Sequence, residues 1–113
     1  MQGFQVKVEI DNPNAVFNMN GDLTHESQKR MLDAYEKVVS SKMQNILLDF
    51  SHVDYINSAG MSVIITILTK AQNAQQALFA CGLSQHFQKI FDMVGLLKYM
   101  PHYDTKDEAM KNI

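Results

Sequence analysis

Residues 45–61 constrain the fold of this chain more than any other stretch. Ile46 to Phe50 is apolar almost without interruption, which is typical of a strand covered on both faces. A short polar loop leads from this strand into Asn57-Ser58-Ala59-Gly60, and apolar residues recur at helical spacing from Met61 onward. The pattern predicts a central strand that feeds a central helix, with the Ser58 hydroxyl at the helix N-terminus.

A predicted strand pair precedes this unit. Apolar and polar residues alternate from Phe4 to Ile10, which indicates a strand with one face toward a core. Asp11-Asn12-Pro13-Asn14 supplies turn chemistry, and Ala15 to Met19 predicts the hairpin partner, ending at Asn20-Gly21. An amphipathic helix is then expected from Thr24 to about Ser40.

The C-terminal part continues the alternation of strands and helices. Ala77 to Cys81 predicts a buried strand, and Ser84 can cap a helix that Gly95 ends. A short edge strand is expected around Lys98 to Tyr103, because the proline within it excludes a central strand. Thr105 with Glu108 forms the capping box of a last helix.

These elements follow the order β-β-α-β-α-β-α-β-α. One hairpin combined with strand-helix-strand crossovers predicts the α/β class, as a mixed β-sheet with helices packed against it. The 113 residues contain no linker or low-complexity tract, so residues 1–113 are expected to form a single domain.

Composition argues against several classes of function. Ten Lys and Arg against twelve Asp and Glu leave a net charge of −2 without a basic cluster, so nucleic acid is not an expected partner. No segment approaches the roughly eighteen apolar residues of a membrane span, and no targeting pattern is present, so no membrane association is expected. Cys81 is the only cysteine, which suggests a small buried side chain in a protein of the reducing cytoplasm.

No metal site and no cofactor are expected. The four histidines never come at a ligand spacing, so we expect them at the surface or at caps, and a Gly-rich phosphate loop is missing from the sequence. Asp49 and Asp54 flank the loop before Ser58, but charged residues at strand ends are usually solvated, which disfavours an acid-base pair. Ser58 with Gly60 is half of a nucleophile elbow, yet Ile56 stands where a small residue is needed, so we expect no enzyme activity.

Ser58 and Asn57 can each cap the predicted helix. Serine is a favoured N-cap, and a Ser58 hydroxyl in that role would only satisfy a backbone N–H group. Asparagine is equally good, and whichever residue caps the helix leaves the other free for solvent. The residue types alone leave this choice open.

The segment from Asp54 to Ile64, with its Ile-Asn-Ser-Ala-Gly-Met core, resembles the signature of bacterial anti-sigma factor antagonists, the STAS-domain family. The resemblance extends to Gly21-Asp22-Leu23, to Ile46–Phe50 and to residues 89–96. It implies a STAS-like fold over the full length.

The resemblance also implies a function. In that family the serine that matches Ser58 is phosphorylated by an anti-sigma factor with serine kinase activity, a protein phosphatase restores it, and only the unphosphorylated form binds. The partner-binding residues implied here are Gly21, Asp22, Asn57, Ser58, Ala59, Gly60 and Met61. A phosphate adds about −1.5 to −2 charges, which in a desolvated interface opposes binding.

Some positions keep a second interpretation. Asn57 and Thr24 stand where the family usually or often has Asp, so a STAS subunit of a signalling or transport assembly, with Ser58 unmodified, is the alternative. Asp22 could instead cap the following helix, with Gly21 a turn residue. Met61 and Met93 could be contact residues, but a methionine on an apolar helical stripe more often packs in the core.

Overall fold

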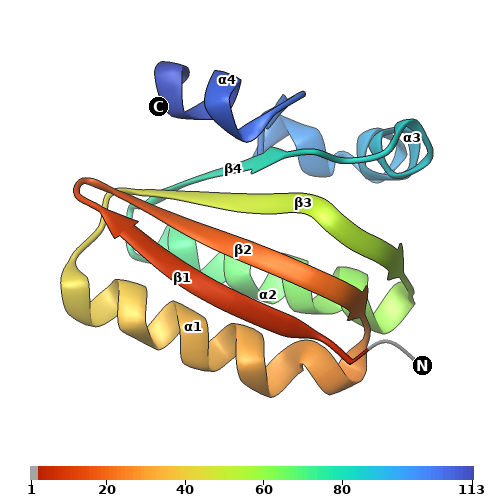
Figure 1. Ribbon diagram of the computed structural model, residues 1–113, viewed down its shortest axis with the longest axis horizontal. Coiled ribbons are helices and arrows are strands. Elements are labelled where there is room, and N and C mark those ends of the chain that lie inside the picture. The colour runs from red at the N-terminus through yellow and green to blue at the C-terminus, as the bar shows by residue number, and fades with distance from the viewer. Residues whose placement is uncertain (1–2) are drawn as a thin grey trace.

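The computed structural model describes residues 3–113 and contains a five-stranded sheet with the strand order β1-β2-β3-β4-β5 (Figure 1). The strands are β1 (Gln5–Asp11), β2 (Asn14–Leu23), β3 (Asn45–Ile56), β4 (Ala77–Cys81) and β5 (His102–Tyr103). The helices are α1 (Gln28–Ser41), α2 (Ser58–Asn73), α3 (Gln85–Met93) and α4 (Lys106–Asn112), with 3-10 helices at His25–Ser27 and Leu96–Lys98.

The sheet is mixed, as the sequence predicts. β1 pairs with β2 antiparallel through a tight turn, and the pairs β2–β3, β3–β4 and β4–β5 are all parallel. Parallel neighbours need a crossover connection, and α1, α2 and α3 supply one each. The α/β fold class and the element order are therefore confirmed.

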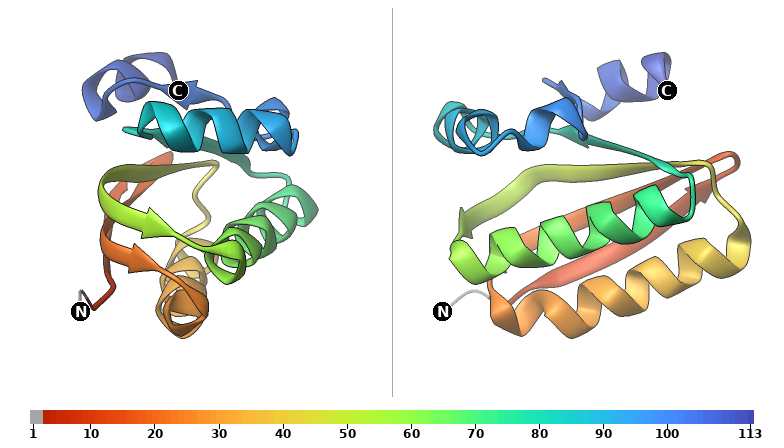
Figure 2. Two further views of the ribbon diagram at one scale, coloured as in Figure 1. Left: turned by 90° about the vertical axis from the view of Figure 1, so that its right-hand side faces the viewer. Right: turned by 180° about the vertical axis from the view of Figure 1, so that it is seen from behind.

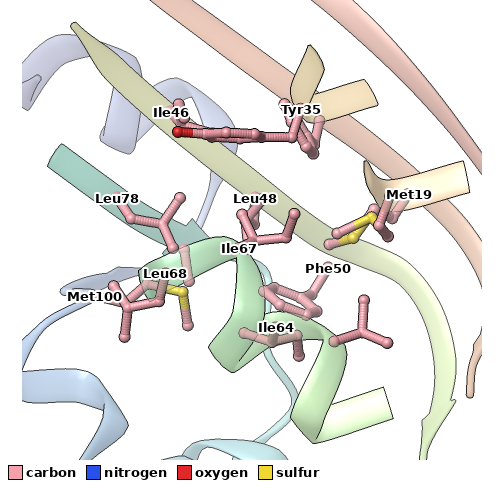
Figure 3. Close-up of a cluster of buried hydrophobic side chains, with 14 of the residues drawn as sticks. Met19, Tyr35, Ile46, Leu48, Phe50, Ile64, Ile67, Leu68, Leu78 and Met100 are labelled. Carbon is pink, nitrogen blue, oxygen red and sulfur yellow. The ribbon is translucent and has the colours of Figure 1, made fainter. Parts of the chain in front are cut away.

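Helices α1 and α2 lie on one face of the sheet, and α4 lies on the opposite side (Figures 1 and 2). The main core fills the space between the sheet and the first two helices. Figure 3 shows Leu48 and Phe50 of β3 next to Ile67 and Ile64 of α2, and Ile46 of β3 next to Tyr35 of α1. Burial of these side chains stabilises α2 in the position where its N-terminal turn meets the end of β2.

The second face of the sheet carries a smaller apolar cluster. Val16, Leu47 and Cys81 are fully buried there beneath Ala109 of α4. The predicted burial of Cys81 is thus confirmed, and the uninterrupted apolar run of β3 is explained, because its middle part is covered on both faces.

Two predicted boundaries are wrong in a way that bears on the site. Residues 51–56 are not a loop, because β3 continues to Ile56, and β2 continues past Gly21 to Leu23. The pairing of β3 with β2 shifts register twice, and β3 changes from fully buried between Ile46 and Phe50 to mostly exposed between Ser51 and Tyr55. The polar residues of this exposed part are what suggested a loop.

The remaining predictions agree with the structure in outline. The first predicted helix begins as the short 3-10 turn before α1, and the expected edge strand is reduced to the two residues of β5. Ser84 caps α3 by accepting the N–H of Phe87, and Thr105 caps α4 by accepting the N–H of Glu108. The Glu108 side chain makes no return bond to the Thr105 N–H within residues 3–113, so only half of the predicted capping box forms. No helix within residues 3–113 has the length and apolar character needed to cross a membrane.

Candidate functional site

Ser58 is the first residue of α2, two residues after β3 ends at Ile56. Figure 1 shows α2 following directly on β3. Its side chain is exposed, and its hydroxyl makes no hydrogen bond within residues 3–113. The hydroxyl therefore stands free at the positive end of a 16-residue helix.

Asn57 caps α2. Its Oδ1 atom accepts the backbone N–H of Gly60 at 2.8 Å, and its own backbone is extended, as an N-cap residue requires. The alternative in which Ser58 is the cap is wrong, because the residue before it already fills that role. Asn57 therefore caps the helix, and the Ser58 hydroxyl is left free.

The end of β2 lies directly against the start of α2. The carbonyl of Leu23 accepts the backbone N–H of Asn57 at 3.3 Å. Gly60 passes the same carbonyl oxygen so closely that a Cβ atom would not fit. In the sheet, Gly21 pairs with Val53 and Asp22 pairs with Tyr55. This packing brings the two parts of the predicted partner-binding set together.

The predicted set differs widely in exposure. Gly21 and Gly60 are buried, whereas Asp22, Asn57, Ala59 and Met61 are half-buried and Ser58 is exposed. Gly21 has a φ of 101°, and a Cβ there would collide with the carbonyl of Gly3, so its role is to let two backbones approach. Only part of the set can contact a partner through side chains.

Asp22 does not cap a helix, so that alternative is wrong. Thr24 is the cap of the 3-10 turn, accepting the N–H of Glu26, and Ser27 returns a bond by accepting the N–H of Thr24. The buried Ser27 hydroxyl also donates to the Asp22 carbonyl at 3.2 Å. The connection after β2 is therefore held in one conformation beside Ser58.

A hollow of about 620 Å³ opens beside this connection. Its lining includes Asn20, Glu26 and Arg30, which the sequence analysis did not single out, together with Asp22 and Thr24. Charges of both signs meet in it, so it is suited to polar groups of a ligand or partner. These residues lie far from Ser58 along the chain and carry no motif that would have indicated them.

Met93 is 85% exposed, so the interpretation as core packing is wrong for this residue. It lies at the last turn of α3, next to Val94, which is 61% exposed. Met61 is half-buried and packs against the main core, as expected. Apolar residues at the end of an amphipathic helix can extend past the surface that the helix covers. The spacing of apolar residues in the sequence does not show where that surface ends.

Two further polar residues differ from expectation. Asp49 is only 8% exposed, so the prediction that it is solvated is wrong. His102 is half-buried, and its Nε2 atom accepts the backbone N–H of Leu83 at 3.1 Å. Burial lowers the pKa of His102, against a smaller opposite effect of the Asp104 and Glu108 carboxylates.

Comparison with protein families gives one match that covers most of the chain. The model of the STAS domain matches residues 5–109. An anti-sigma F factor antagonist of Paenibacillus polymyxa is 21% identical over 110 residues, covering 96% of this chain and 94% of the relative. A protein named as an anti-sigma factor antagonist, BtrV of Bordetella bronchiseptica, is 29% identical over 66 residues, 58% of this chain and 57% of the relative.

Solved structures share the fold. An anti-sigma factor antagonist from Mycobacterium paratuberculosis has a TM-score of 0.81 at 19% identity, covering 96% of this chain and 92% of that one. Phosphorylated SpoIIAA of Bacillus has a TM-score of 0.73 at 17% identity, with 96% and 97% covered. A sulfate transporter family protein from Wolinella succinogenes has a TM-score of 0.78 at 15% identity, with 91% and 86% covered.

Proposed function

Because the chain belongs to the STAS domain family, we propose that it is an anti-sigma factor antagonist that binds an anti-sigma factor while Ser58 is unphosphorylated and is released when Ser58 is phosphorylated. The partner is then an anti-sigma factor with serine kinase activity, and a protein phosphatase reverses the modification. In this proposal the protein acts in the cytoplasm by binding its partner and not by catalysing a reaction.

The observation that carries this proposal is the free hydroxyl of Ser58. Since Asn57 takes the capping role, no structural bond has to break when a kinase approaches the Ser58 oxygen. The N-terminus of α2 can also stabilise a phosphate once it is attached, because unpaired N–H groups and the helix dipole favour negative charge. Modification of Ser58 is therefore compatible with the fold.

Loss of binding follows from charge. A phosphoserine adds about −1.5 to −2 charges at neutral pH. It would join Asp22, on the strand that borders the site, and Asp54, four residues before Ser58. A partner surface complementary to the neutral serine would then have to desolvate a dianion, which opposes docking.

Calorimetry with the anti-sigma factor tests the binding part. Ser58→Ala should bind as the wild type does, and Ser58→Asp should show no measurable binding. Asp at the first position of a helix is favourable, so the loss would not come from unfolding. Thr69→Asp is the control, because it adds the same charge to an exposed position of α2 about 16 Å further along the helix. Equal affinity of Ser58→Ala and Ser58→Asp would contradict the proposal.

Intact-mass measurement tests the modification. Incubation with ATP and the anti-sigma factor should add one phosphate to the wild-type protein and none to Ser58→Ala. A pull-down from the native cell with wild-type and Ser58→Asp protein identifies the partner, which should appear only with the wild type.

A second candidate function has support of its own. The fold is shared with a sulfate transporter family protein, and Asn57 stands where the antagonists usually have Asp. The chain would then be a STAS subunit of a signalling or transport assembly in which Ser58 stays unmodified. A phosphate on Ser58 in the mass measurement would argue against this function.

A further inference from the structure

Strand β3 contains two more residues than the part of β2 with which it pairs. β2 has 10 residues and β3 has 12, and the first and last residues of the two strands are partners. The register shifts first where Asn18 faces Asp49 and Asn20 faces His52, and again between Gly21 and Asp22. Each shift places one extra residue in β3, as a β-bulge does.

Asp49 stabilises the first shift. Its Oδ1 atom accepts the backbone N–H of Ser51 at 2.9 Å and the Ser51 hydroxyl at 2.6 Å. A residue in a bulge loses its place in the ladder of backbone hydrogen bonds, so its N–H group needs another acceptor. The Asp49 carboxyl group, which is only 8% exposed, supplies the missing acceptor.

Gly82 fixes Ser51 from the neighbouring strand end. It follows β4 with a φ of 74°, and a Cβ atom there would collide with the Ser51 hydroxyl and come within 2.8 Å of the Ser51 backbone nitrogen. Ser51 is therefore held between the Asp49 carboxyl group and the backbone after β4. Specific contacts from Asp49 and Gly82 therefore fix the position of the bulge.

The shifts redirect the last part of β3 toward α2. Core-facing residues come two apart up to Phe50 and three apart afterwards, at Val53 and Ile56. Figure 1 shows β3 bending in this region before it reaches α2. Ile56 again faces the core, so the next residue, Asn57, can donate its N–H to the Leu23 carbonyl. Ser58 then follows at the surface, next to the end of β2.

We propose that Asp49, acting through Ser51, is a positioning residue that sets where the Ser58 turn lies against the end of β2. Its consequence for partner binding rests on the function proposed above. Its consequence for the turn itself does not, so the two can be tested separately.

Amide hydrogen exchange tests the positioning without any partner. In Asp49→Ala and in Ser51→Ala, the amides of Asn57 and Gly60 should exchange about tenfold faster than in the wild type after correction for global unfolding, because the turn loses its support. Asp49→Asn keeps an oxygen in the accepting position and should exchange as the wild type does.

Asn45→Ala is the matched control. It removes a side-chain hydrogen bond of 2.9 Å to Asn14 at the other end of the same strand pair. It should leave exchange at Asn57 and Gly60 unchanged. Equal effects of Asn45→Ala and Asp49→Ala, or no effect of Asp49→Ala, would overturn the proposal.

Calorimetry with the anti-sigma factor forms the second arm. Asp49→Ala should weaken binding about tenfold, and Asp49→Asn should restore it. If exchange responds as expected but the wild type binds no anti-sigma factor, the proposed function fails and the positioning role stands. If the wild type binds but exchange at the turn is insensitive to Asp49, the positioning role fails alone.

Discussion

Gly60 lies so close to the carbonyl oxygen of Leu23 that no other residue type fits there without movement. The same carbonyl accepts the N–H of Asn57, so the end of β2 and the first turn of α2 form one rigid corner. Ser58 is the exposed residue at this corner.

Gly60→Ala should destabilise the protein by about 1–3 kcal/mol, as overpacking does. In a helix, alanine normally raises the free energy of unfolding by up to about 1 kcal/mol relative to glycine. A net loss of stability would therefore come from the collision of the added Cβ atom with the Leu23 carbonyl. Urea denaturation measures it. Gly3→Ala, where nothing lies within 4 Å of the added atom, should stay within about 0.5 kcal/mol of the wild type. A Gly60→Ala variant as stable as the wild type would show that the end of β2 and the first turn of α2 can move apart at little cost, which would contradict a rigid corner.

Asn57→Ala should cost about 1 kcal/mol of stability, because the N–H of Gly60 loses its acceptor. Asn57→Asp should keep the cap and lose little or nothing, since aspartate is an equally good N-cap at a helix N-terminus. Ser58→Ala should be neutral, because its hydroxyl makes no bond within residues 3–113. Thermal denaturation of the three variants distinguishes the two candidate caps, and a loss confined to Ser58→Ala would reverse the assignment.

Stability should fall as the pH drops through about 6.5, because of His102. Burial lowers the pKa of His102 in the folded protein, while the unfolded chain keeps the ordinary value of 6.5. The unfolded state therefore binds more protons in this range, and the loss levels off once the pH is below the folded pKa. Protonation would also put an N–H group against the N–H of Leu83.

His102→Gln should flatten this pH dependence in urea denaturation between pH 5 and 7.5, values chosen around the histidine range. Identical slopes for the wild type and His102→Gln would assign the effect to another group.

Cys81 should not react with a thiol reagent at pH 8 in the native protein. Burial raises its pKa to about 12, with a further contribution from the Asp49 charge, so neither access nor thiolate is available. In concentrated urea it should react at once. Ser58→Cys provides the contrast, because a thiol at that exposed position should react in the folded state, and rapid labelling of native wild-type protein would contradict the buried location.

Periodicity predicts most of the fold because each strand and helix has to bury one face. Ile46 to Phe50 could be assigned to a doubly covered strand, and Ala77 to Cys81 was placed with its observed boundaries. The same reasoning failed at residues 51–56, since two register shifts change which side chains face the core. A bulge is fixed by contacts such as those of Asp49 and Gly82, which come from other parts of the chain or break the local pattern.

The candidate site divides in the same way. The residue types alone predict a serine at the start of the central helix, because Asn and Ser directly before an apolar stretch of helical spacing indicate a helix N-terminus. Which side chain caps that helix, and whether Met93 is buried, depended on neighbours distant in sequence.

The sequence by itself therefore determined the order of the strands and helices, the α/β class and the position of Ser58 along the chain, since these follow from local periodicity and residue chemistry. Only the tertiary structure decided that Asn57 is the cap, that the Ser58 hydroxyl is free, and that the end of β2, which carries Gly21 and Asp22, contacts the start of α2. Asparagine and serine are equal in capping propensity, and only the packing of α2 against Leu23 sets the backbone geometry that selects between them.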